Sequence, residues 1–335
     1  MSVELSVVIP TYQRRESLRQ VLAALCRQTL PLDAFEVIVS VDGSRDGTEQ
    51  MLAALDVPYE LRWVASAHGG PGAARNLGAQ GVQGRFLLFL DDDIFSTPQL
   101  LASHLACHRG NGERTVCLGQ VRTPPVQPLS PWEQYLCARL EEQYDKLGRA
   151  GYRPDFWDCL SANFSLGRVL WDESGGFDRV FRVARHEDVE LGYRLQQLGA
   201  HFVYRPLALG YHRFLKSPSE GLRDARSDGC SAVRLARRHP QLAPHLFGRR
   251  WRRYPPHFRS LLQWSLNRPQ QHRRLAARSE VLLQWSQRLP VPPILSRAIC
   301  RLAFHLHFWL GVQMELQDEE LARSLSPWLE GRRDS

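Results

Sequence analysis

Residues 85–93 read Arg-Phe-Leu-Leu-Phe-Leu-Asp-Asp-Asp. A short run of bulky apolar residues that ends abruptly in charged ones is typical of a strand buried on both faces of a parallel sheet. Three neighbouring carboxylates repel one another unless a cation neutralises them, and Asp91 and Asp93 can point to the same side. The stretch therefore predicts a buried strand that leads into a site for a hard divalent cation. A solvated turn or a helix cap is the alternative interpretation of the same triplet.

The chain before this stretch alternates short apolar runs with helical patterns. Expected strands cover residues 5–9, 36–41, 61–65 and 85–90, and expected helices cover residues 17–27, 46–55 and 73–81. This β-α-β-α-β-α-β order predicts a parallel sheet with helices on both faces. Ligands of such sheets bind beyond the carboxyl ends of the strands, so the residues that follow each strand are the first candidates for a site.

Polar or glycine-rich segments follow all of these strands. Gly69–Gly72, after the third strand, has two open interpretations: a plain turn before a helix that begins at Pro71, or a helix N-terminus that faces a diphosphate together with Arg75. A dinucleotide-binding G-x-G-x-x-G motif is excluded, because it would need glycine at position 75 and should follow the first strand. The other strand ends are Pro10-Thr11-Tyr12, Asp42-Gly43-Ser44 and Asp91-Asp92-Asp93.

Two further motifs extend this series downstream. Residues 175–178 read Gly-Gly-Phe-Asp, and residues 187–191 read Glu-Asp-Val-Glu-Leu at the start of an expected helix. Taken alone, acids in the first turn of a helix are explained by capping and by the helix dipole. The whole set of motifs, in this order and at these spacings, resembles the family 2 glycosyltransferases of the GT-A fold over residues 3–212. The remaining motifs that carry the resemblance are Val7–Tyr12, Val41–Ser44, Gly72–Asn76 and Leu90–Asp93.

The resemblance implies an α/β fold of the GT-A type, Rossmann-like, with a mixed, mostly parallel sheet, and the mostly helical pattern after about residue 215 predicts a C-terminal helical extension. It implies a catalytic domain over residues 1–215, divided into a nucleotide-binding half (1–95) and an acceptor half (96–215). Residues 216–335 are then expected to form a basic helical C-terminal region.

The resemblance also implies how the donor is held. Tyr12 is expected against the face of the nucleotide base, Asp42 as acceptor of a base N–H, and Arg75 near the base or the diphosphate. Asp92 is expected to contact the ribose. The donor-binding residues implied in this way are Pro10, Thr11, Tyr12, Asp42, Arg75, Asp91 and Asp92.

Metal and catalytic residues follow from the same resemblance. Asp91 and Asp93 match a DxD motif that binds Mg²⁺ or Mn²⁺ bridging the diphosphate, and His212 resembles a histidine that completes the metal site. Asp188 matches the catalytic base. An ionised carboxylate can take the proton of the acceptor hydroxyl while the cation stabilises the leaving diphosphate. A base and a leaving group on opposite faces of the sugar give inversion at the sugar carbon.

The expected activity is transfer of a single sugar from a nucleotide-diphosphate sugar to an acceptor hydroxyl. A UDP-sugar is expected from its frequency in the family, and the acceptor is a glycan, a lipid-linked molecule or a small molecule in cell-surface glycan or glycolipid synthesis. Processive members carry a QxxRW motif and transmembrane helices. Here the nearest match is Arg250-Trp251 with Phe247 in place of glutamine, and no apolar run has membrane-spanning length, which favours single transfer.

Two other functions stay open on the sequence. A nucleotidyltransferase that makes the sugar nucleotide has a similar sheet, but Gln13–Arg15 lacks the glycines of its usual loop. A non-catalytic nucleotide-sugar-binding protein is the second alternative, and the intact acids at Asp91, Asp93 and Asp188 argue against it.

The charge of the chain is uneven. Residues 213–335 hold 22 Lys+Arg and 10 Asp+Glu, a net charge of +12, whereas the preceding residues carry −4. This basic region suggests an anionic partner. Ile294–Met314 predicts either a helix packed on the protein or an interfacial amphipathic helix that contacts an anionic membrane surface. No motif supports nucleic acid binding, so none is expected.

The seven cysteines are scattered, odd in number and without a CxxC pair. A disulfide framework or a thiolate zinc site is therefore not expected, and a reducing compartment fits better. The first residues lack a basic stretch followed by a long apolar run, so no signal peptide is expected. These features predict a cytoplasmic protein, with peripheral attachment to the inner face of the membrane as an open alternative.

Overall fold

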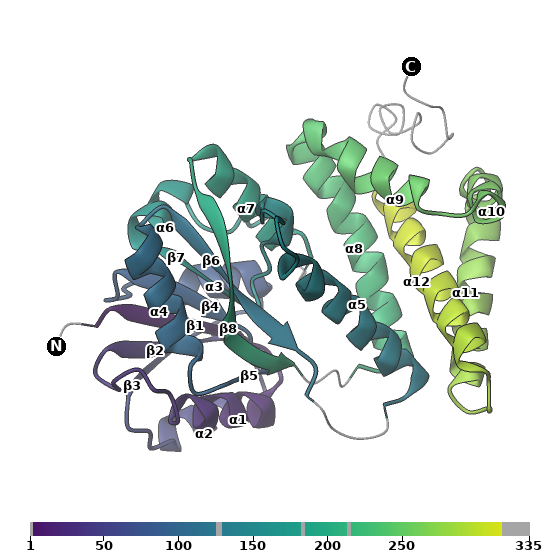
Figure 1. Cartoon of the computed structure of the whole chain (residues 1–335). Coiled ribbons are helices and arrows are strands. Elements are labelled where there is room, and N and C mark those ends of the chain that lie inside the picture. Colours follow the sequence, from purple (N-terminus) through teal and green to yellow (C-terminus); the bar gives the residue numbers. More distant parts are fainter. Residues whose placement is uncertain (1–2, 125–128, 182–184, 213–215, 317–335) are drawn as a thin grey trace. The chain divides into compact units, whose positions relative to one another are not determined.

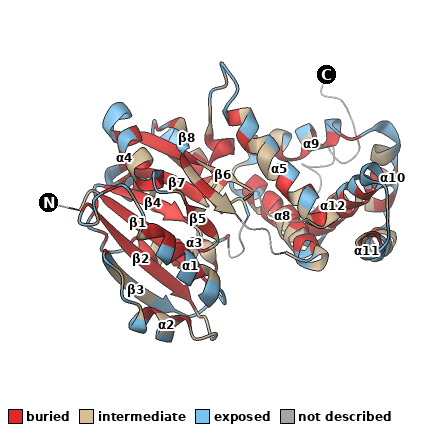
Figure 2. Cartoon of the chain, turned by 60° about the horizontal axis from the view of Figure 1, so that its bottom comes forward, coloured by how far each residue is buried: buried red, intermediate tan, exposed pale blue. Residues whose placement is uncertain are grey.

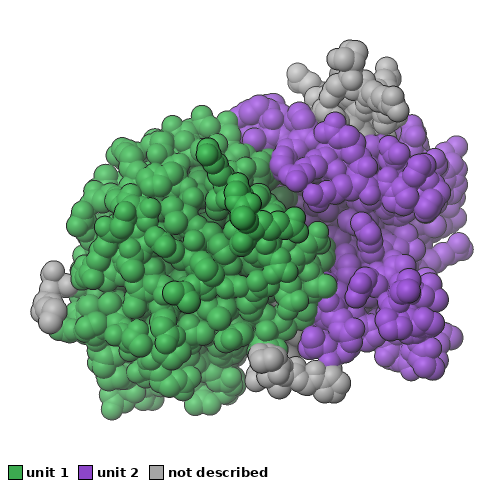
Figure 3. All heavy atoms as spheres, viewed as in Figure 1, with its two compact units in different colours: residues 1–126, 137–214 green, residues 127–136, 215–335 purple. Residues whose placement is uncertain are grey.

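The computed structural model describes residues 3–124, 129–181, 185–212 and 216–316 (Figure 1). The chain divides into two compact units (Figure 3). The first unit contains residues 1–126 and 137–214, and the second contains residues 127–136 and 215–335.

The first unit is built on a mixed sheet whose described strands have the order β3-β2-β1-β4-β7-β6-β8-β5. The strands β1 to β4 pair in parallel, as the alternating pattern predicts. The strand β7 runs antiparallel to β4 and β6, β5 runs antiparallel to β8, and β6 and β8 are parallel. The strands are β1 (Leu5–Thr11), β2 (Phe35–Asp42), β3 (Glu60–Ser66), β4 (Phe86–Leu90), β5 (Ile94–Ser96), β6 (Thr115–Arg122), β7 (Asn163–Gly167) and β8 (His201–His212).

Helices cover both faces of this sheet, and β1, β2 and β4 are therefore buried along their whole length (Figure 2). Alternate residues of a strand point to opposite faces. Val7 and Ile9 pack with α1 and α4, whereas Val8 faces Gly78 of α3 on the other side. The helices of this unit, with α5 reaching it from residue 137, are α1 (Arg15–Leu25), α2 (Thr48–Ala54), α3 (Pro71–Gly78), α4 (Leu100–Asn111), α5 (Pro131–Leu147), α6 (Arg168–Ser174) and α7 (Glu187–Gln197).

The sheet opens between β1 and β4. The strand β1 pairs with β2 from Leu5 to Thr11, but with β4 only from Leu5 to Val8. The chain also changes direction here, since β2 and β3 lie on one side of β1 and β4 lies on the other. Such a switch point leaves a crevice beyond the carboxyl ends of the strands, where ligands of open α/β sheets bind.

The second unit is helical. Its central helix, α12, packs against α8 on one side and α11 on the other. Phe304, Phe308 and Trp309 are buried, so this part of Ile294–Met314 forms the packed helix and not the interfacial one. In the described part of the chain, no helix combines the length and the apolar composition required to cross a bilayer. The main helices are α8 (Pro218–Arg238), α9 (Arg249–Arg252), α10 (Pro256–Leu266), α11 (Pro269–Ser286) and α12 (Pro293–Glu315).

Two glycines allow α8 and α12 to approach at backbone distance. A Cβ added to Gly229 would lie 2.0 Å from the carbonyl oxygen of Phe308, and one added to Gly311 would lie 1.9 Å from that of Arg226. Real Cβ atoms do not come this close to a backbone oxygen, so any other residue at either position would force the helices apart. The apolar packing of α12 thus depends on two residues without side chains.

We therefore expect Gly229→Ala to lower the free energy of unfolding by about 1–3 kcal/mol, the usual cost of overpacking a core. Gly110→Ala in α4 is the matched control, because nothing lies within 4 Å of a Cβ at that position. Alanine should be neutral or stabilising there, by about 0.5–1 kcal/mol, since it has the higher helix propensity. Denaturant titrations followed by tryptophan fluorescence measure both variants. Equal midpoints would show that the helices do not meet through Gly229.

Candidate active site

The end of β2 places Asp42 under a tight loop. Its carboxylate accepts hydrogen bonds from the backbone N–H groups of Gly69 (2.7 Å) and Gly70 (3.0 Å), and Nδ1 of His68 lies 2.8 Å from Oδ2. Asp42 is buried. The glycines after β3 therefore form the turn before α3, which begins at Pro71, and they hold Asp42 in one orientation.

Tyr12 lies beside Asp42, at the end of β1. Its ring stacks on His68 with 4.2 Å between the ring centroids, yet the residue stays 45% exposed. Neighbouring Pro10 is buried in β1, opposite Ser40 of β2. Tyr12, Asp42 and His68 thus combine an exposed aromatic ring with a fixed carboxylate, which are the two features expected for holding a flat heterocycle.

The acidic triplet after β4 is neutralised by basic side chains of this chain. The guanidinium of Arg14 bonds Asp92 at 3.1 Å and also bonds Asp93, and Nε2 of His212 lies 3.1 Å from Oδ2 of Asp93. The hydroxyl of Thr11 donates to Asp92 at 2.7 Å. The mutual repulsion that predicted a divalent cation is therefore already balanced in part by protein groups.

The carboxylates of Asp92 and Asp93 differ in acidity. Burial, together with the negative charge of Asp93, raises the pKa of Asp92 to about 7. Burial would raise the pKa of Asp93 as well, but the bond from His212 and the charge of Arg14 outweigh it and lower that pKa. Asp93 is thus the carboxylate of this pair that stays ionised and available to a cation.

Arg75 links the end of β4 to the start of α7. Its guanidinium bonds Asp91 at 2.7 Å and Glu187 at 3.1 Å, and the side chains of Arg75 and Glu187 are each only 3% exposed. The ring of Phe177 lies 5.4 Å from the guanidinium carbon. Arg75 therefore holds two elements that are more than 90 residues apart in the sequence.

Asn76, the next residue, explains why the Gly-Gly-Phe-Asp motif accompanies Arg75. Its side chain donates to the carbonyl of Phe177 and accepts from the N–H of Phe177, both at 2.8 Å. Gly176 has a left-handed backbone (φ +79°), and a Cβ there would lie 2.6 Å from the side-chain oxygen of Asn76. The side chain of Asn76 thus connects α3 to the Gly-Gly-Phe-Asp turn through two hydrogen bonds with the backbone of Phe177, and the turn needs glycine at position 176.

The three acids at the start of α7 have different partners. Glu187 bonds Arg75, and Glu190 bonds Arg194 within the same helix at 2.7 Å. Asp188 accepts the backbone N–H of Ser161 at 3.2 Å and of Val189 at 2.8 Å, and among the described residues it forms no ion pair. Asp188 is therefore a partly exposed carboxylate whose orientation is fixed by backbone groups.

Asp188 also lies in the same neighbourhood as the triplet. Burial is the main cause that raises the pKa of Tyr144, and the negative charges of Asp188 and Asp91 both add to it. The charge of Asp188 acts on Arg75 too, which bonds Asp91 directly. Hydrogen bonds show the same proximity, because Ser161 donates to Asp188 while the next residue, Ala162, accepts the backbone N–H of Asp91 at 3.1 Å.

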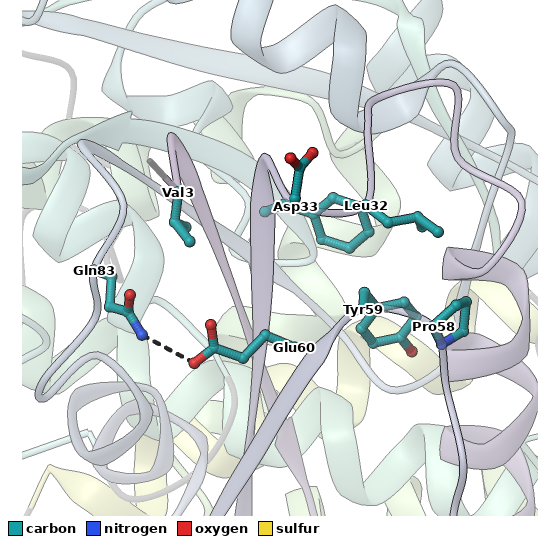
Figure 4. Close-up of a pocket in the computed structure, with 8 residues that line it drawn as sticks. Val3, Leu32, Asp33, Pro58, Tyr59, Glu60 and Gln83 are labelled. Atoms are coloured by element: carbon teal, nitrogen blue, oxygen red, sulfur yellow. Dashed lines mark hydrogen bonds between the residues drawn. The ribbon is translucent and has the colours of Figure 1, made fainter. Parts of the chain in front are cut away.

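A hollow at the opposite end of the same strands has none of this chemistry (Figure 4). It lies where β2 and β3 begin, whereas Asp42 lies where β2 ends. Among its lining side chains, Gln83 donates a hydrogen bond to Glu60 at 2.9 Å. None of the predicted site residues borders it. The lining residues are Val3, Leu32, Asp33, Phe35, Pro58, Tyr59, Glu60 and Gln83.

The pair Asp93 and His212 fits a divalent cation. Carboxylate and imidazole are both ligands that such cations accept, and the 3.1 Å between Nε2 of His212 and Oδ2 of Asp93 is here the length of the hydrogen bond that joins them. No group of three or more His, Cys, Asp or Glu side chains able to hold a metal occurs in the described residues. The protein would thus supply few ligands, as is usual for Mg²⁺ that also binds phosphate oxygens and water.

Sequence reasoning did not assign roles to three of these side chains. Arg14 neutralises two carboxylates of the triplet, His68 stacks on Tyr12, and Glu187 anchors Arg75. A signal for Arg14 was present, because it follows the strand adjacent to the triplet and a guanidinium neutralises carboxylates as a metal does. His68 and Glu187 have no such signal, since their partners are fixed only by the fold.

Comparisons with known proteins agree with this architecture. The chain is 32% identical over 269 residues to the uncharacterized glycosyltransferase YfnE of Bacillus subtilis, covering 67% of this chain and 68% of YfnE. It is 32% identical over 271 residues to validoxylamine A glucosyltransferase of Streptomyces hygroscopicus subsp. jinggangensis, covering 72% of this chain but only 63% of that protein.

Structural similarity extends over nearly the whole chain. The crystal structure of S. aureus TarS 1-349 in complex with UDP-GlcNAc superposes with a TM-score of 0.54 at 19% identity, over 96% of this chain and 92% of that one. The model of the family described as glycosyl transferase family 2 matches residues 6–171. With the sequence similarity to YfnE over two thirds of both proteins, this match shows that the chain belongs to glycosyl transferase family 2.

Proposed function

We propose that this protein is an inverting glycosyltransferase that transfers a single sugar from a nucleotide-diphosphate sugar to an acceptor hydroxyl. The observation that carries the proposal is the state of Asp188: a carboxylate held by two backbone N–H groups, with no ion pair among the described residues, close to Arg75 and Asp91. Membership of the family indicates the class of reaction. Because Glu187 and Glu190 are paired with arginines, Asp188 is the acid of α7 that we propose as general base.

Asp188 would act as the general base. An acceptor hydroxyl is a poor nucleophile, and a carboxylate within hydrogen-bond reach takes its proton as the hydroxyl oxygen attacks the sugar carbon. Glu187 and Glu190 are poor candidates for this task, because both are buried in ion pairs with arginines. Attack on the sugar face opposite the diphosphate inverts the configuration at that carbon.

The departing diphosphate would be stabilised at the triplet. Asp93 and His212 would hold Mg²⁺ or Mn²⁺, which when bound supplies positive charge for the leaving phosphates. Asp91, the third metal ligand that the resemblance implies, bonds Arg75 at 2.7 Å in this structure. Arg14, whose side chain is 40% exposed, contacts Asp92 and Asp93 and is placed to bind phosphate oxygens directly. Arg75 is too deeply buried for that role, so we assign it to positioning Asp91 and α7 instead.

The donor base would lie against Tyr12 and bond Asp42. We propose a UDP-sugar, in line with the UDP-GlcNAc complex of the similar TarS structure. The acceptor class would be a glycan, a lipid-linked molecule or a small molecule, and synthesis of cell-surface glycans or glycolipids is the setting that we propose. Release of UDP from a UDP-sugar, without pyrophosphate formation from UTP and a sugar 1-phosphate, distinguishes this activity from nucleotidyl transfer.

Asp188→Asn should lower the rate of sugar transfer by about 10²–10⁴-fold, the usual contribution of a general base, and leave donor affinity within about twofold. UDP release measures the rate and calorimetry with the intact donor measures the affinity. Asp172→Asn is the control, because it changes an exposed acid of α6 in the same unit. Turnover of Asp188→Asn within threefold of the parent would remove Asp188 from the role of base.

Asp93→Asn and His212→Ala should each raise the Mn²⁺ concentration required for half-saturation, by about tenfold or more, since each removes one of two protein ligands. Calorimetric titration with Mn²⁺ in the presence of UDP reports this without any turnover. Asp56→Asn, an exposed acid after α2, should leave the titration unchanged. Identical titration curves for all three variants would place the cation elsewhere.

Tyr12→Ala should weaken UDP binding by about 1–3 kcal/mol, the contribution of one aromatic ring stacked on a base. Because the side chain is 45% exposed, the substitution should not unfold the protein. Leu207→Ala, at a 75% exposed position of β8, is the control for loss of an exposed apolar side chain in the same unit. Unchanged UDP affinity in Tyr12→Ala would move the base away from β1.

A further inference from the structure

Exposed apolar side chains gather in one short segment of the second unit. Residues 281–295, here called the 281–295 patch, contain six of the fourteen large hydrophobic residues that are exposed in the described chain. A random scatter of exposed apolar residues needs no explanation, but a contiguous group does. The six are Val281 (54%), Leu282 (47%), Trp285 (63%), Leu289 (54%), Ile294 (86%) and Leu295 (53%).

These residues all lie at one end of a helical hairpin. The helix α11 ends at Ser286 and α12 begins at Pro293, so the six-residue connection keeps the last turns of α11 and the first turn of α12 together. At a rise of about 1.5 Å per residue, Val281 is less than about 10 Å from the end of its helix. The patch is therefore a compact apolar tip.

The tip is not a displaced part of the core. Both helices already bury their other face: Leu283 and Ser286 of α11 and Ile299 and Cys300 of α12 are inside the unit. Leu283, Ile299 and Cys300 belong to the same hydrophobic cluster as α8. The exposed residues alternate with these buried ones, so no rotation of either helix could cover both sets.

Arginines are frequent on the hairpin that carries this apolar tip. Residues 268–301 contain seven arginines and one acid, Glu280, and all seven arginines are exposed. Glu280 accepts a hydrogen bond from Ser219 of α8. In α11, Arg278 precedes Val281 and Trp285 at helical spacing, which places basic and apolar side chains on one stripe. In α12, Ile294 is followed at the same spacing by Arg297 and Arg301.

We propose that the 281–295 patch docks on a bilayer surface rich in anionic lipids. Trp285, Leu289, Ile294 and Leu295 would enter the boundary between headgroups and acyl chains, and the flanking arginines would contact lipid phosphates. This combination of a basic rim with exposed tryptophan and aliphatic side chains is the one that interfacial segments use. The patch consists of residues of the second unit only, and its docking does not depend on the reaction that we propose for the first unit.

Charge argues against the other occupants of such a surface. A symmetric dimer through the patch would bring the arginines next to it, such as Arg278, Arg288 and Arg297, close to those of the second copy, with Glu280 the single acid of residues 268–301 to balance them. Nucleic acid would satisfy the arginines but would leave Val281, Leu289 and Ile294 in water, since aliphatic side chains gain little from phosphates. An anionic bilayer is the surface that matches both the charge and the apolar area.

Flotation of the full-length protein with vesicles tests the proposal. Protein should float with phosphatidylcholine vesicles that contain 30 mol% phosphatidylglycerol, and far less with phosphatidylcholine alone, with binding that weakens as salt rises. Trp285→Ser combined with Ile294→Ser should lower the partition coefficient about tenfold or more. Trp264→Ser is the matched control, because Trp264 is 44% exposed on α10 of the same unit but lies outside the patch. Arg297→Gln combined with Arg301→Gln should lower binding several-fold at low salt.

Three results would overturn the proposal. The first is equal binding to neutral and anionic vesicles. The second is an equal loss of flotation in the control and the patch variant. The third is concentration-dependent self-association in sedimentation without vesicles that disappears in Trp285→Ser with Ile294→Ser, because that result would identify the patch as a dimer interface. Circular dichroism and thermal unfolding, measured on the same preparations, verify that each variant is folded.

Discussion

The site depends on one buried arginine, Arg75. Arg75 lies inside the first unit between the carboxylates of Asp91 and Glu187, and its charge is acceptable there only because both partners are present. Removing one member of a buried ion pair costs about 3–5 kcal/mol, because the other charge is left unpaired. The arrangement of β4, α3 and α7 is therefore specified electrostatically, and Asp188 has its position because its neighbour Glu187 is held by Arg75.

Asn76 supports the same arrangement by a different interaction. Where Arg75 fixes side chains, Asn76 fixes the backbone of Phe177 through a donor and an acceptor. The helix α3 approaches the sheet closely, since a Cβ on Gly78 would lie 2.7 Å from Val8. A short helix with little freedom thus carries both residues, which explains why separate motifs of the sequence meet with defined geometry.

Local patterns were sufficient to predict the first part of the fold. The apolar runs at 5–9, 36–41 and 85–90 are strands, because parallel strands that are buried on both faces consist almost entirely of apolar residues. The run at 61–65 is also a strand, although its residues are exposed or half-buried. Family resemblance added the mixed sheet. The partners of the acids could not be read from the sequence, since Glu187, Asp188 and Glu190 are the same kind of residue in one turn. Only their contacts with Arg75, backbone N–H groups and Arg194 distinguish them.

The loop over Asp42 limits which heterocycles can pair with it. A carboxylate offers about four lone-pair sites. The N–H groups of Gly69 and Gly70 use one site on each oxygen, and Nδ1 of His68 lies 2.8 Å from Oδ2 and crowds that oxygen. One acceptor site then remains, on Oδ1. Uracil presents a single ring N–H on its pairing edge, whereas guanine presents two adjacent donors, one of which would stay unsatisfied. Counting lone pairs at Asp42 thus favours a ligand with one N–H group at this position, which supports the UDP-sugar that we propose as donor.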